Sequence, residues 1–189
     1  ELSDTVYGGS ITFNADGTIN NASHIDANTQ DIIDYSSYTN KAIINLRLGT
    51  AQVDLKTDTF YGIDNAIGTS QADTIYGGTG VDSIFGEEGN DYIYASAGSD
   101  IIDGGANSDL VDYSASFTGI NLTLLDSGAT VNVSHNIGGV ASDDSLTNIE
   151  GIKGSTTASN TLIGNNMNNT LIGGNQIDII KGVSGNNSL

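Results

Sequence analysis

The segment from Gly68 to Asp112 repeats every nine residues, and this period constrains the fold more than any other feature of the chain. Its five units read GTSQADTIY, GGTGVDSIF, GEEGNDYIY, ASAGSDIID and GGANSDLVD. The sixth place always holds an aspartate, namely Asp73, Asp82, Asp91, Asp100 and Asp109. The eighth place always holds a branched aliphatic residue, namely Ile75, Ile84, Ile93, Ile102 and Val111. Five units in one register indicate a repeat architecture in which each unit packs against its neighbours.

Each unit combines a turn with a short strand. Places one to six are rich in Gly, Ser, Ala and Asn, which suit a turn whose backbone visits positive φ. Places seven to nine are strand formers with one residue pointing inward. If each unit reverses the chain, two units make one coil of 18 residues, and aliphatic residues from both sides meet in a thin core. The repeat therefore predicts an all-β fold, a parallel β-roll or β-solenoid.

In such a coil, units of like parity stack on the same side. Asp73, Asp91 and Asp109 then form one column, and Asp82 and Asp100 form the other. Carboxylates about 5 Å apart, one strand spacing, repel each other unless cations lie between them. Oxygen ligands, glycine turns that can aim carbonyls inward, no Cys and only two His favour calcium over zinc or copper. Magnesium fits less well because it needs a tighter octahedron and retains its waters.

The units GGTGVDSIF and GEEGNDYIY resemble the GGxGxDxUx repeat of the RTX family, the calcium-binding β-roll proteins. The resemblance implies several calcium ions between neighbouring turns, bound by sixth-place aspartates and by carbonyls of the glycine turns. The ligands would be Asp73, Asp82, Asp91, Asp100 and Asp109, with carbonyls of Gly78, Gly80, Gly89 and Gly98. The sequence departs from the family pattern at Gln71 and Asn107 in the fourth place, and at Ala95 and Ser96 in the opening glycine pair. We expect weaker calcium binding at those turns.

The nine-residue step continues in the C-terminal segment, where asparagine replaces most sixth-place aspartates. The sixth places are Asn160, Asn169, Asp178 and Asn187, and the inward places are Leu162, Leu171, Ile180 and Leu189. An asparagine offers an amide oxygen without charge, so we expect these turns to hold calcium poorly or not at all and to stack by amide ladders. Asp178 is the candidate carboxylate ligand of this segment.

A first repeat block precedes the main one. Residues 4–9 (DTVYGG) copy residues 73–78, and residues 31–36 copy residues 109–114, which makes Asp31 a further candidate ligand. The register is lost between Ser10 and Asn28. Two non-repeat segments, residues 35–67 and 113–154, match each other, and we expect wider strand-turn excursions that continue the solenoid.

These blocks divide the chain into four parts. We expect a degenerate first roll with a non-repeat β segment over residues 1–67, the main calcium-binding roll over 68–112, a second non-repeat β segment over 113–154, and a calcium-poor roll over 155–189. Together they would form one continuous elongated solenoid. Because the chain opens and closes within repeats, whereas solenoids usually end in atypical caps, we expect a piece of a larger protein.

Charge and composition restrict the partners. The chain has 23 acidic and 5 basic residues and a formal charge of −18, which argues against binding to nucleic acid or anionic membranes, because both need cationic contacts. Without calcium, this charge opposes compaction, and we expect a largely disordered apo chain. No apolar run is long enough to span a bilayer, so we expect no membrane insertion. No motif brings His24 or His135 together with a serine, and we expect no catalytic activity.

The sequence favours a calcium-binding structural module of a secreted or cell-surface RTX protein, such as an S-layer protein or an adhesin. The alternatives are the C-terminal secretion and folding module of an exported protease, lipase or epimerase, or a polysaccharide-binding module. Partners besides calcium would be neighbouring copies, adjacent domains of the parent protein or a cell-surface polysaccharide. Tyr76, Phe85 and Tyr94 in the ninth place are expected to pack across strands rather than to stack on a sugar.

The resemblance also implies type I secretion to the exterior of a Gram-negative bacterium, hence an extracellular location at the cell surface. Calcium sites of extracellular modules have Kd values of roughly 10⁻⁴ to 10⁻³ M, so they stay empty in the cytosol and fill outside. We therefore expect the chain to travel unfolded and to fold on arrival.

Overall fold

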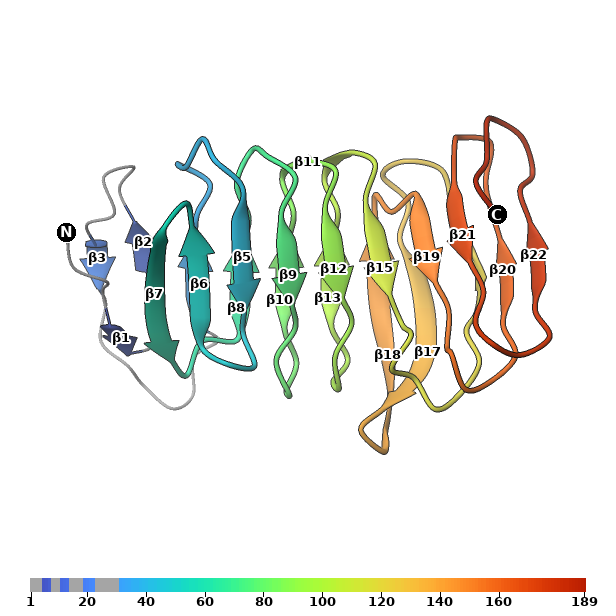
Figure 1. Ribbon diagram of the computed structural model, residues 1–189, viewed down its shortest axis with the longest axis horizontal. Helices are drawn as coiled ribbons and strands as arrows, with labels where there is room; N and C mark the ends of the chain where they lie inside the picture. The colour runs from blue at the N-terminus through green and yellow to red at the C-terminus, as the bar shows by residue number, and fades with distance from the viewer. Residues whose placement is uncertain (1–4, 8–10, 14–18, 23–30) are drawn as a thin grey trace.

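The computed structural model describes residues 5–7, 11–13, 19–22 and 31–189. Every regular element in these ranges is a β-strand, and the strands stack into an elongated, flattened solenoid, with β1 and β22 near its opposite ends (Figure 1). The predicted all-β, mostly parallel solenoid is therefore confirmed. Within the same ranges, no helix is long and apolar enough to cross a membrane.

Two large sheets form the broad faces of the solenoid. The nine-stranded sheet contains, in spatial order, β1 (Thr5–Tyr7), β7 (Lys56–Tyr61), β6 (Thr50–Val53), β5 (Ala42–Asn45), β9 (Thr74–Tyr76), β12 (Tyr92–Tyr94), β15 (Leu110–Asp112), β19 (Gly151–Lys153) and β21 (Thr170–Ile172). The eight-stranded sheet contains β17 (Val131–Ile137), β18 (Val140–Thr147), β13 (Ile101–Asp103), β10 (Ser83–Phe85), β8 (Asn65–Ile67), β4 (Ile32–Asp34), β2 (Ile11–Phe13) and β3 (Ile19–Ala22).

Two smaller sheets complete the structure. A three-stranded sheet near the C-terminus has the order β16 (Asn121–Thr123), β20 (Thr161–Ile163) and β22 (Ile179–Lys181). The short strands β11 (Glu88–Gly89) and β14 (Ala106–Asn107) pair with each other at the turns of neighbouring coils.

Strands of the main block pair in parallel at a step of 18 residues. Ile93 of β12 is in register with Ile75 on one side and Val111 on the other, and Ile84 of β10 is in register with Ile102. The coil of two nonapeptides predicted from the repeat is therefore confirmed. All five eighth-place residues have 0% exposure.

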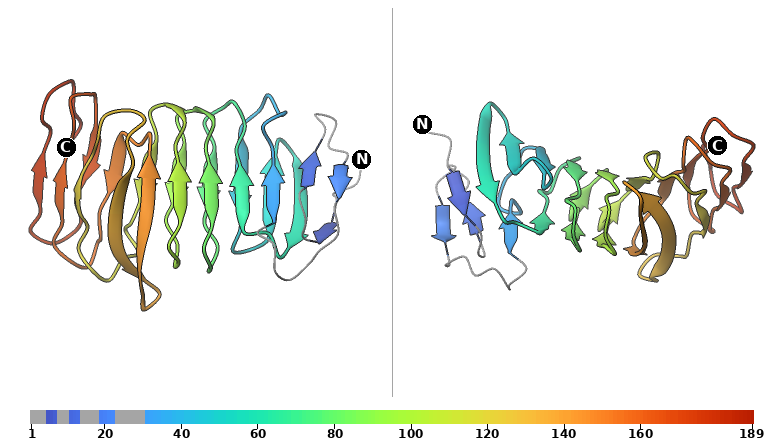
Figure 2. Two further views of the ribbon diagram at one scale, coloured as in Figure 1. Left: turned by 180° about the vertical axis from the view of Figure 1, so that it is seen from behind. Right: turned by 90° about the horizontal axis from the view of Figure 1, so that it is seen from below.

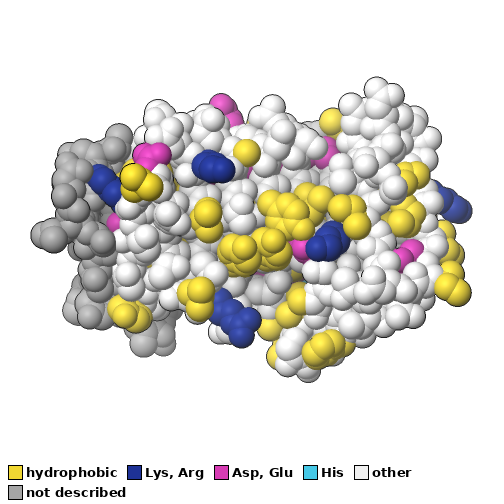
Figure 3. Space-filling model, in the orientation of Figure 1, with side chains coloured by type: hydrophobic (Ala, Val, Ile, Leu, Met, Phe, Trp, Pro, Cys, Tyr) yellow, Lys and Arg dark blue, Asp and Glu magenta, His cyan; other side chains and the backbone are white. Residues whose placement is uncertain are grey.

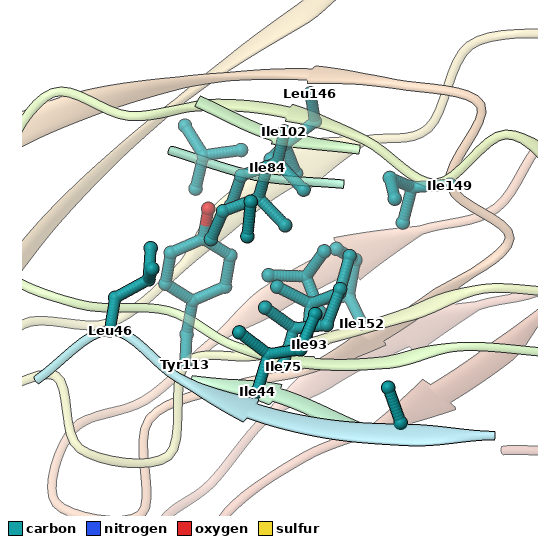
Figure 4. Packing of buried hydrophobic residues seen from close by; sticks show 14 of the residues in the cluster. Ile44, Leu46, Ile75, Ile84, Ile93, Ile102, Tyr113, Leu146, Ile149 and Ile152 are labelled. Carbon is teal, nitrogen blue, oxygen red and sulfur yellow. The ribbon is translucent and has the colours of Figure 1, made fainter. Parts of the chain in front are cut away.

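The core consists of two facing rows of aliphatic side chains. Figure 4 shows Ile44, Ile75, Ile93 and Ile152 along one side, and Ile84, Ile102 and Leu146 along the other. Each three-residue strand contributes its central side chain to this core, because alternate side chains of a strand point to opposite faces. The core is consequently long and only two side chains thick.

The two non-repeat segments leave the coil as antiparallel strands and then return to it. In the first segment, β5, β6 and β7 form an antiparallel meander, and β5 pairs in parallel with β9. In the second, β17 and β18 form an antiparallel hairpin, and β18 pairs in parallel with β13. Seen from below, these segments widen the solenoid on either side of the narrow main block (Figure 2). The antiparallel pairing is the part of these excursions that the sequence did not predict.

A buried tyrosine anchors each excursion. The hydroxyl of Tyr35 donates to Asp58 Oδ2 at 2.9 Å, and the hydroxyl of Tyr113 donates to Asp144 Oδ2 at 2.8 Å. Both tyrosines have 0% exposure and both open their segment after an aspartate. The similarity between the two segments is therefore structural as well as sequential.

The ends of the solenoid depart from the expected pattern in one place. Leu162 and Leu171 are buried at 0% exposure and Ile180 packs against the core, but Leu189 is 66% exposed, so its predicted inward place is wrong. The reason is that the structure stacks no further coil over Leu189. Of the first repeat block, β1 pairs in parallel with β7, whereas Asp4, residues 8–10, 14–18 and 23–30, and with them His24, lie outside the described residues.

Candidate metal centre

The first column of carboxylates is formed by Asp73, Asp91, Asp109 and Glu150. All four are buried, and each is linked to the next by a backbone hydrogen bond. The N–H of Asp73 donates to Asp91 Oδ1 at 2.7 Å, that of Asp91 to Asp109 Oδ1 at 2.8 Å, and that of Asp109 to Glu150 Oε2 at 3.1 Å. The backbone of each coil thus fixes one carboxylate oxygen of the next coil.

The second column is formed by Asp82, Asp100 and Asp144, on the other side of the coil. It uses the same link, because the N–H of Asp82 donates to Asp100 Oδ1 and that of Asp100 donates to Asp144 Oδ1, both at 2.9 Å. Asp64 lies in line with this column, since the next residue, Asn65, is in register with Ser83. The separation into two columns by parity, as predicted, is confirmed for the five aspartates of the main block.

Three members of these columns were not among the predicted ligands: Asp64, Asp144 and Glu150. Each comes from a non-repeat segment and re-enters the column after a long excursion. The signal that could have found them is a triplet of an acid, any residue and an aliphatic, as in Asp64-Asn65-Ala66, Asp144-Ser145-Leu146 and Glu150-Gly151-Ile152. The third residue of each triplet is buried in the core, as the eighth-place residues are.

Two carboxylate oxygens of the first column have no partner. Asp91 Oδ2 and Asp109 Oδ2 are buried and accept no hydrogen bond from any described residue. A carbonyl oxygen lies near each of them: a Cβ added to Gly86 would meet both Asp91 Oδ2 and the oxygen of Gly104, and one added to Gly104 would meet Asp109 Oδ2 and the oxygen of Asn148. Acceptors that face each other without a donor need a cation or a proton between them.

The pKa values of these carboxyls show the same imbalance. Burial, followed by the charge of Asp73, raises the pKa of Asp91 to about 7, although a hydrogen bond from the backbone of Asp73 opposes the rise. Burial also raises the pKa of Asp109 to about 8, and the charges of Asp91 and Glu150 add to it. A cation at this position would favour the ionised form of both groups. The donor set of carboxylate and carbonyl oxygens is the one that calcium prefers.

The other predicted aspartates already have protein donors. The N–H and hydroxyl of Thr69 donate to Asp73 at 2.5 and 2.9 Å. The hydroxyl of Ser96 lies 2.8 Å from Asp100 Oδ2 and 3.2 Å from Asp82 Oδ2, so it spans the second column. Ser96 stands where the family pattern has glycine, and its hydroxyl lies between two carboxylates of the second column. The main block therefore fits calcium better along the first column than along the second.

The predicted carbonyl ligands lie in the turns, and the backbone conformation explains the fourth-place glycines Gly89 and Gly98. Gly89 and Gly98 have φ values of 130° and 137°, and Asn107 occupies the same place with φ 92°. A Cβ on Gly89 would lie 2.5 Å from the carbonyl oxygen of Gln71, so the neighbouring coil leaves no room for a side chain there. Positive φ and this close approach both favour glycine.

Only part of the predicted carbonyl set lies next to a carboxylate. The oxygen of Gly80 and Asp100 Oδ1 both adjoin the Cβ position of Gly98, whereas Gly78 contributes its N–H, which donates to Asp82 Oδ2 at 2.6 Å. The carbonyls found against the unpartnered oxygens belong to Gly104 and Asn148. The individual carbonyl assignments stay predictions.

In the described ranges, no three His, Cys, Asp or Glu side chains lie close enough together to hold a metal ion by themselves. An ion in either column would therefore need backbone carbonyls among its ligands. The glycine turns predict the same ligand set, in which aspartates supply carboxylate oxygens and the turns supply carbonyl oxygens.

The remaining candidate carboxylates lie at the two ends. The carbonyl of Asp31 accepts the N–H groups of Asp64 and Asn65 at 3.1 and 2.9 Å, which puts Asp31 in line with the second column. Asp178 Oδ2 accepts the N–H of Gly174 at 2.8 Å and its Oδ1 accepts two hydrogen bonds from Asn160. Burial acts to raise the pKa of Asp178, but these hydrogen bonds outweigh it and lower the pKa.

The second column ends on a buried histidine. His135 Nε2 lies 3.0 Å from Asp144 Oδ1, and its ring packs against Tyr113 with ring centroids 5.4 Å apart. Burial acts to lower the pKa of His135, but the hydrogen bond and charge of Asp144 outweigh it and raise the pKa. Asp144 Oδ2 accepts the hydroxyl of Tyr113 and its Oδ1 accepts the N–H of Asp100, so His135 lies at the end of the second column beside a carboxylate that already has protein donors.

The ninth-place tyrosines pack on each other. The rings of Tyr76 and Tyr94 are stacked, with centroids 4.3 Å apart and an interplanar angle of 3°, and Tyr92 lies against Tyr94 at 4.8 Å. Figure 3 shows hydrophobic side chains gathered in the middle of this face, with basic and acidic side chains at the edge of the group. Since Tyr76 and Tyr94 turn their ring faces toward each other, the expected cross-strand packing is confirmed for this pair.

Comparison with protein-family models matches residues 58–93, 76–111 and 156–189 to the RTX calcium-binding nonapeptide repeat (4 copies). The first two matches cover the main block with its buried carboxylate columns, and the third covers the asparagine-rich segment. Comparison with curated proteins gave no match. The nine-residue repeats and the parallel β-roll identify residues 58–111 and 156–189 of the chain as RTX calcium-binding nonapeptide repeats.

Proposed function

We propose that this calcium-binding module is a structural element of a secreted or cell-surface protein, which folds and stiffens on extracellular calcium and serves surface-layer assembly or adhesion. The observation that supports it best is the pair of buried, unpartnered oxygens, Asp91 Oδ2 and Asp109 Oδ2. A buried carboxylate without a donor destabilises the fold, so the first column depends on an external cation.

Calcium would be held by the residues of neighbouring coils together. A bound Ca²⁺ supplies two positive charges and about six to eight positions for oxygen ligands. Asp91 and Asp109 would contribute Oδ2, and the carbonyl oxygens of Gly104 and Asn148 already face these atoms. Because each Oδ1 is fixed by the N–H of the preceding coil, ion binding would lock successive coils to one another.

The expected location follows from the range of calcium affinities in extracellular modules. Sites with Kd of roughly 10⁻⁴ to 10⁻³ M stay empty in the cytosol and fill outside the cell, which would couple folding of the module to export. The formal charge of −18 opposes compaction until the ions bind. We propose that the module has no catalytic activity and that any chemistry belongs to other parts of its parent protein.

The proposal is tested by titrating calcium into chelator-treated protein and following far-ultraviolet circular dichroism. We expect a cooperative gain of β signal at roughly 10⁻⁴ to 10⁻³ M calcium, and a much weaker response to magnesium. Asp91→Ala should raise the required calcium concentration, whereas Asp126→Ala, at an exposed loop position, should not. A calcium-free chain with the full β spectrum, unchanged by the ion, would refute calcium-dependent folding.

The structural role is tested by the state of assembly. Scattering and electron microscopy with and without calcium would distinguish ordered sheets, which support a surface-layer role, from dispersed monomers, which support an adhesin or the tail of an exported enzyme. Calcium-induced sheets that dissolve on chelation are the expected result for the surface-layer function.

A further inference from the structure

We infer that the side-chain amides of Asn160, Asn169 and Asn187 take the place of calcium in the C-terminal roll, so that residues 155–189 fold without the ion. The inference rests on the proposed calcium sites of the main block. It assigns opposite ion requirements to two segments that match the same calcium-binding repeat.

Asn160 shows the replacement most completely. Its Nδ2 donates to the carbonyl oxygens of Ser155 and Ala158, at 2.9 and 3.2 Å, and to Asp178 Oδ1 at 2.8 Å. The two carbonyls belong to its own turn, and the carboxylate belongs to the next coil on the same side. Turn carbonyls and a carboxylate of a neighbouring coil are the groups that calcium would join in the main block.

The other two asparagines use their amides in the same way. Asn187 Nδ2 donates to the carbonyl oxygen of Ser184 at 2.9 Å and lies 3.5 Å from that of Gly185, both in its own turn. Asn169 Nδ2 donates to Asn165 Oδ1 at 3.0 Å and to the carbonyl oxygen of Glu150, in the preceding coil, at 3.3 Å. The Asn169 amide nitrogen therefore satisfies acceptors that are buried, whereas the acceptors of Asn187 Nδ2 are exposed at the end of the roll.

The amide oxygens of Asn160 and Asn187 keep the link along the column, whereas Asn169 Oδ1 accepts the N–H of Asn165 in its own turn. Asn160 Oδ1 accepts the N–H of Ile120 at 3.0 Å, and Asn187 Oδ1 accepts the N–H of Asn169 at 2.9 Å. This is the bond that Asp91 and Asp109 accept through Oδ1 in the main block. Aspartate and asparagine thus share one role, the acceptor that joins coils, and differ in the second atom.

That second atom decides the ion requirement. The Oδ2 of an ionised aspartate is an acceptor and needs a cation or a proton, whereas the Nδ2 of asparagine is a donor and serves the acceptors itself. Asp91 Oδ2 and Asp109 Oδ2 have no partner, whereas Asn160 Nδ2 has three. Asp178 agrees with this pattern, because its Oδ1 is already held by Asn160. In the C-terminal roll, the side-chain amides therefore supply the donors for these acceptors, and calcium is not needed to join them.

Hydrogen–deuterium exchange with mass spectrometry tests the inference in the whole chain. In calcium-free protein, we expect residues 155–189 to remain protected while residues 68–112 exchange rapidly, and calcium to protect only the latter. Equal, rapid exchange of both segments without calcium would overturn the inference. Protection of residues 68–112 without calcium would instead count against the proposed calcium dependence of the main block, independently of the asparagines.

A pair of variants isolates the amide. Asn160→Asp removes the Nδ2 donor and adds a charge beside Asp178, so exchange of residues 155–189 in calcium-free protein should accelerate about tenfold or more, the loss expected for a buried hydrogen-bonding group. Calcium should restore protection, because the change recreates an aspartate turn. Asn166→Asp adds the same charge at an exposed position of this roll and should leave exchange unchanged. An Asn160→Asp protein that is as protected without calcium as the unaltered chain would refute the assignment.

Discussion

Without calcium, the protein should lose stability as the pH rises from about 4 to 8, which is opposite to the behaviour of a protein whose carboxylates are paired. Asp91 illustrates the sign. Its pKa is about 7 in the folded chain and near 3.8 when exposed. Below pH 4 both states are protonated; between 4 and 7 the unfolded chain releases the proton and the folded chain keeps it, so folding becomes less favourable.

The size of the loss follows from the shift. Three pH units at about 1.4 kcal/mol each give roughly 4 kcal/mol for Asp91 alone. Total stabilities of domains are about 5–15 kcal/mol, so a loss of this size is a large part of the whole. Saturating calcium at pH 8 should restore the stability, because the ion favours the ionised carboxylates.

The assay is urea unfolding of metal-free protein, begun at pH 4, where the carboxyls are protonated, and continued to higher pH for as long as a folded population remains, followed by circular dichroism. Asp91→Asn removes this titrating group and should reduce the loss between pH 4 and 8 by a few kcal/mol. Glu88→Gln removes an exposed carboxyl close by and should leave the loss unchanged, which controls for the general effect of net charge. Equal losses in the Asp91→Asn and unaltered proteins, or a stability that rises with pH, would refute the reasoning.

Three further outcomes are expected. Ile93→Ala should lower the free energy of unfolding of the calcium-loaded protein by about 2–5 kcal/mol, measured by urea unfolding, because Ile93 is fully buried in a core two side chains thick; a loss below 1 kcal/mol would contradict that packing. Ser96→Gly should raise the number of calcium ions bound, measured by equilibrium dialysis, because it removes the hydroxyl between Asp82 and Asp100; an unchanged number would show that this hydroxyl does not replace an ion. Tyr113→Phe should cost about 1–3 kcal/mol in thermal or urea unfolding, because it leaves a buried carboxylate oxygen without its donor; a neutral change would mean that Tyr113 does not anchor its excursion.

The repeat predicted the solenoid because each of its places has one structural role, in the turn, in the carboxylate column or in the core. Ile75, Ile93 and Val111 point inward because side chains alternate between the two faces of a strand, so their row in the core could be inferred without knowing which strands pair. The same is true of the columns, since a step of 18 residues places Asp73 beside Asp91. The core row and the carboxylate columns were therefore predicted well, because the local pattern of the repeat determines both.

The missed features depend on contacts between distant segments. Asp144 joins the column of Asp100 only because the β17–β18 hairpin returns the chain to the coil, and no nine-residue count crosses that hairpin. The difference between Asp91 and Asp82 depends on the N–H of Gly78 and the hydroxyl of Ser96, because both lie within hydrogen-bonding distance of Asp82 Oδ2. The five aspartates occupy equivalent positions in the repeat, so the sequence predicted the same role for all of them and did not reveal that their hydrogen-bond partners differ.

The excursions show that consecutive members of a carboxylate column need not be a fixed number of residues apart in the sequence. Consecutive members of a column are 18 residues apart in the main block, yet Asp100 is joined to Asp144, 44 positions on, and Asp109 to Glu150, 41 positions on. A triplet of an acidic residue, any residue and an aliphatic residue is enough to supply the next carboxylate of a column and the next side chain of the core. Within the second excursion, the exposed hairpin turn at Gly138 and Gly139 takes part in none of the column links, so we expect that a segment inserted at this turn would leave the stack in place.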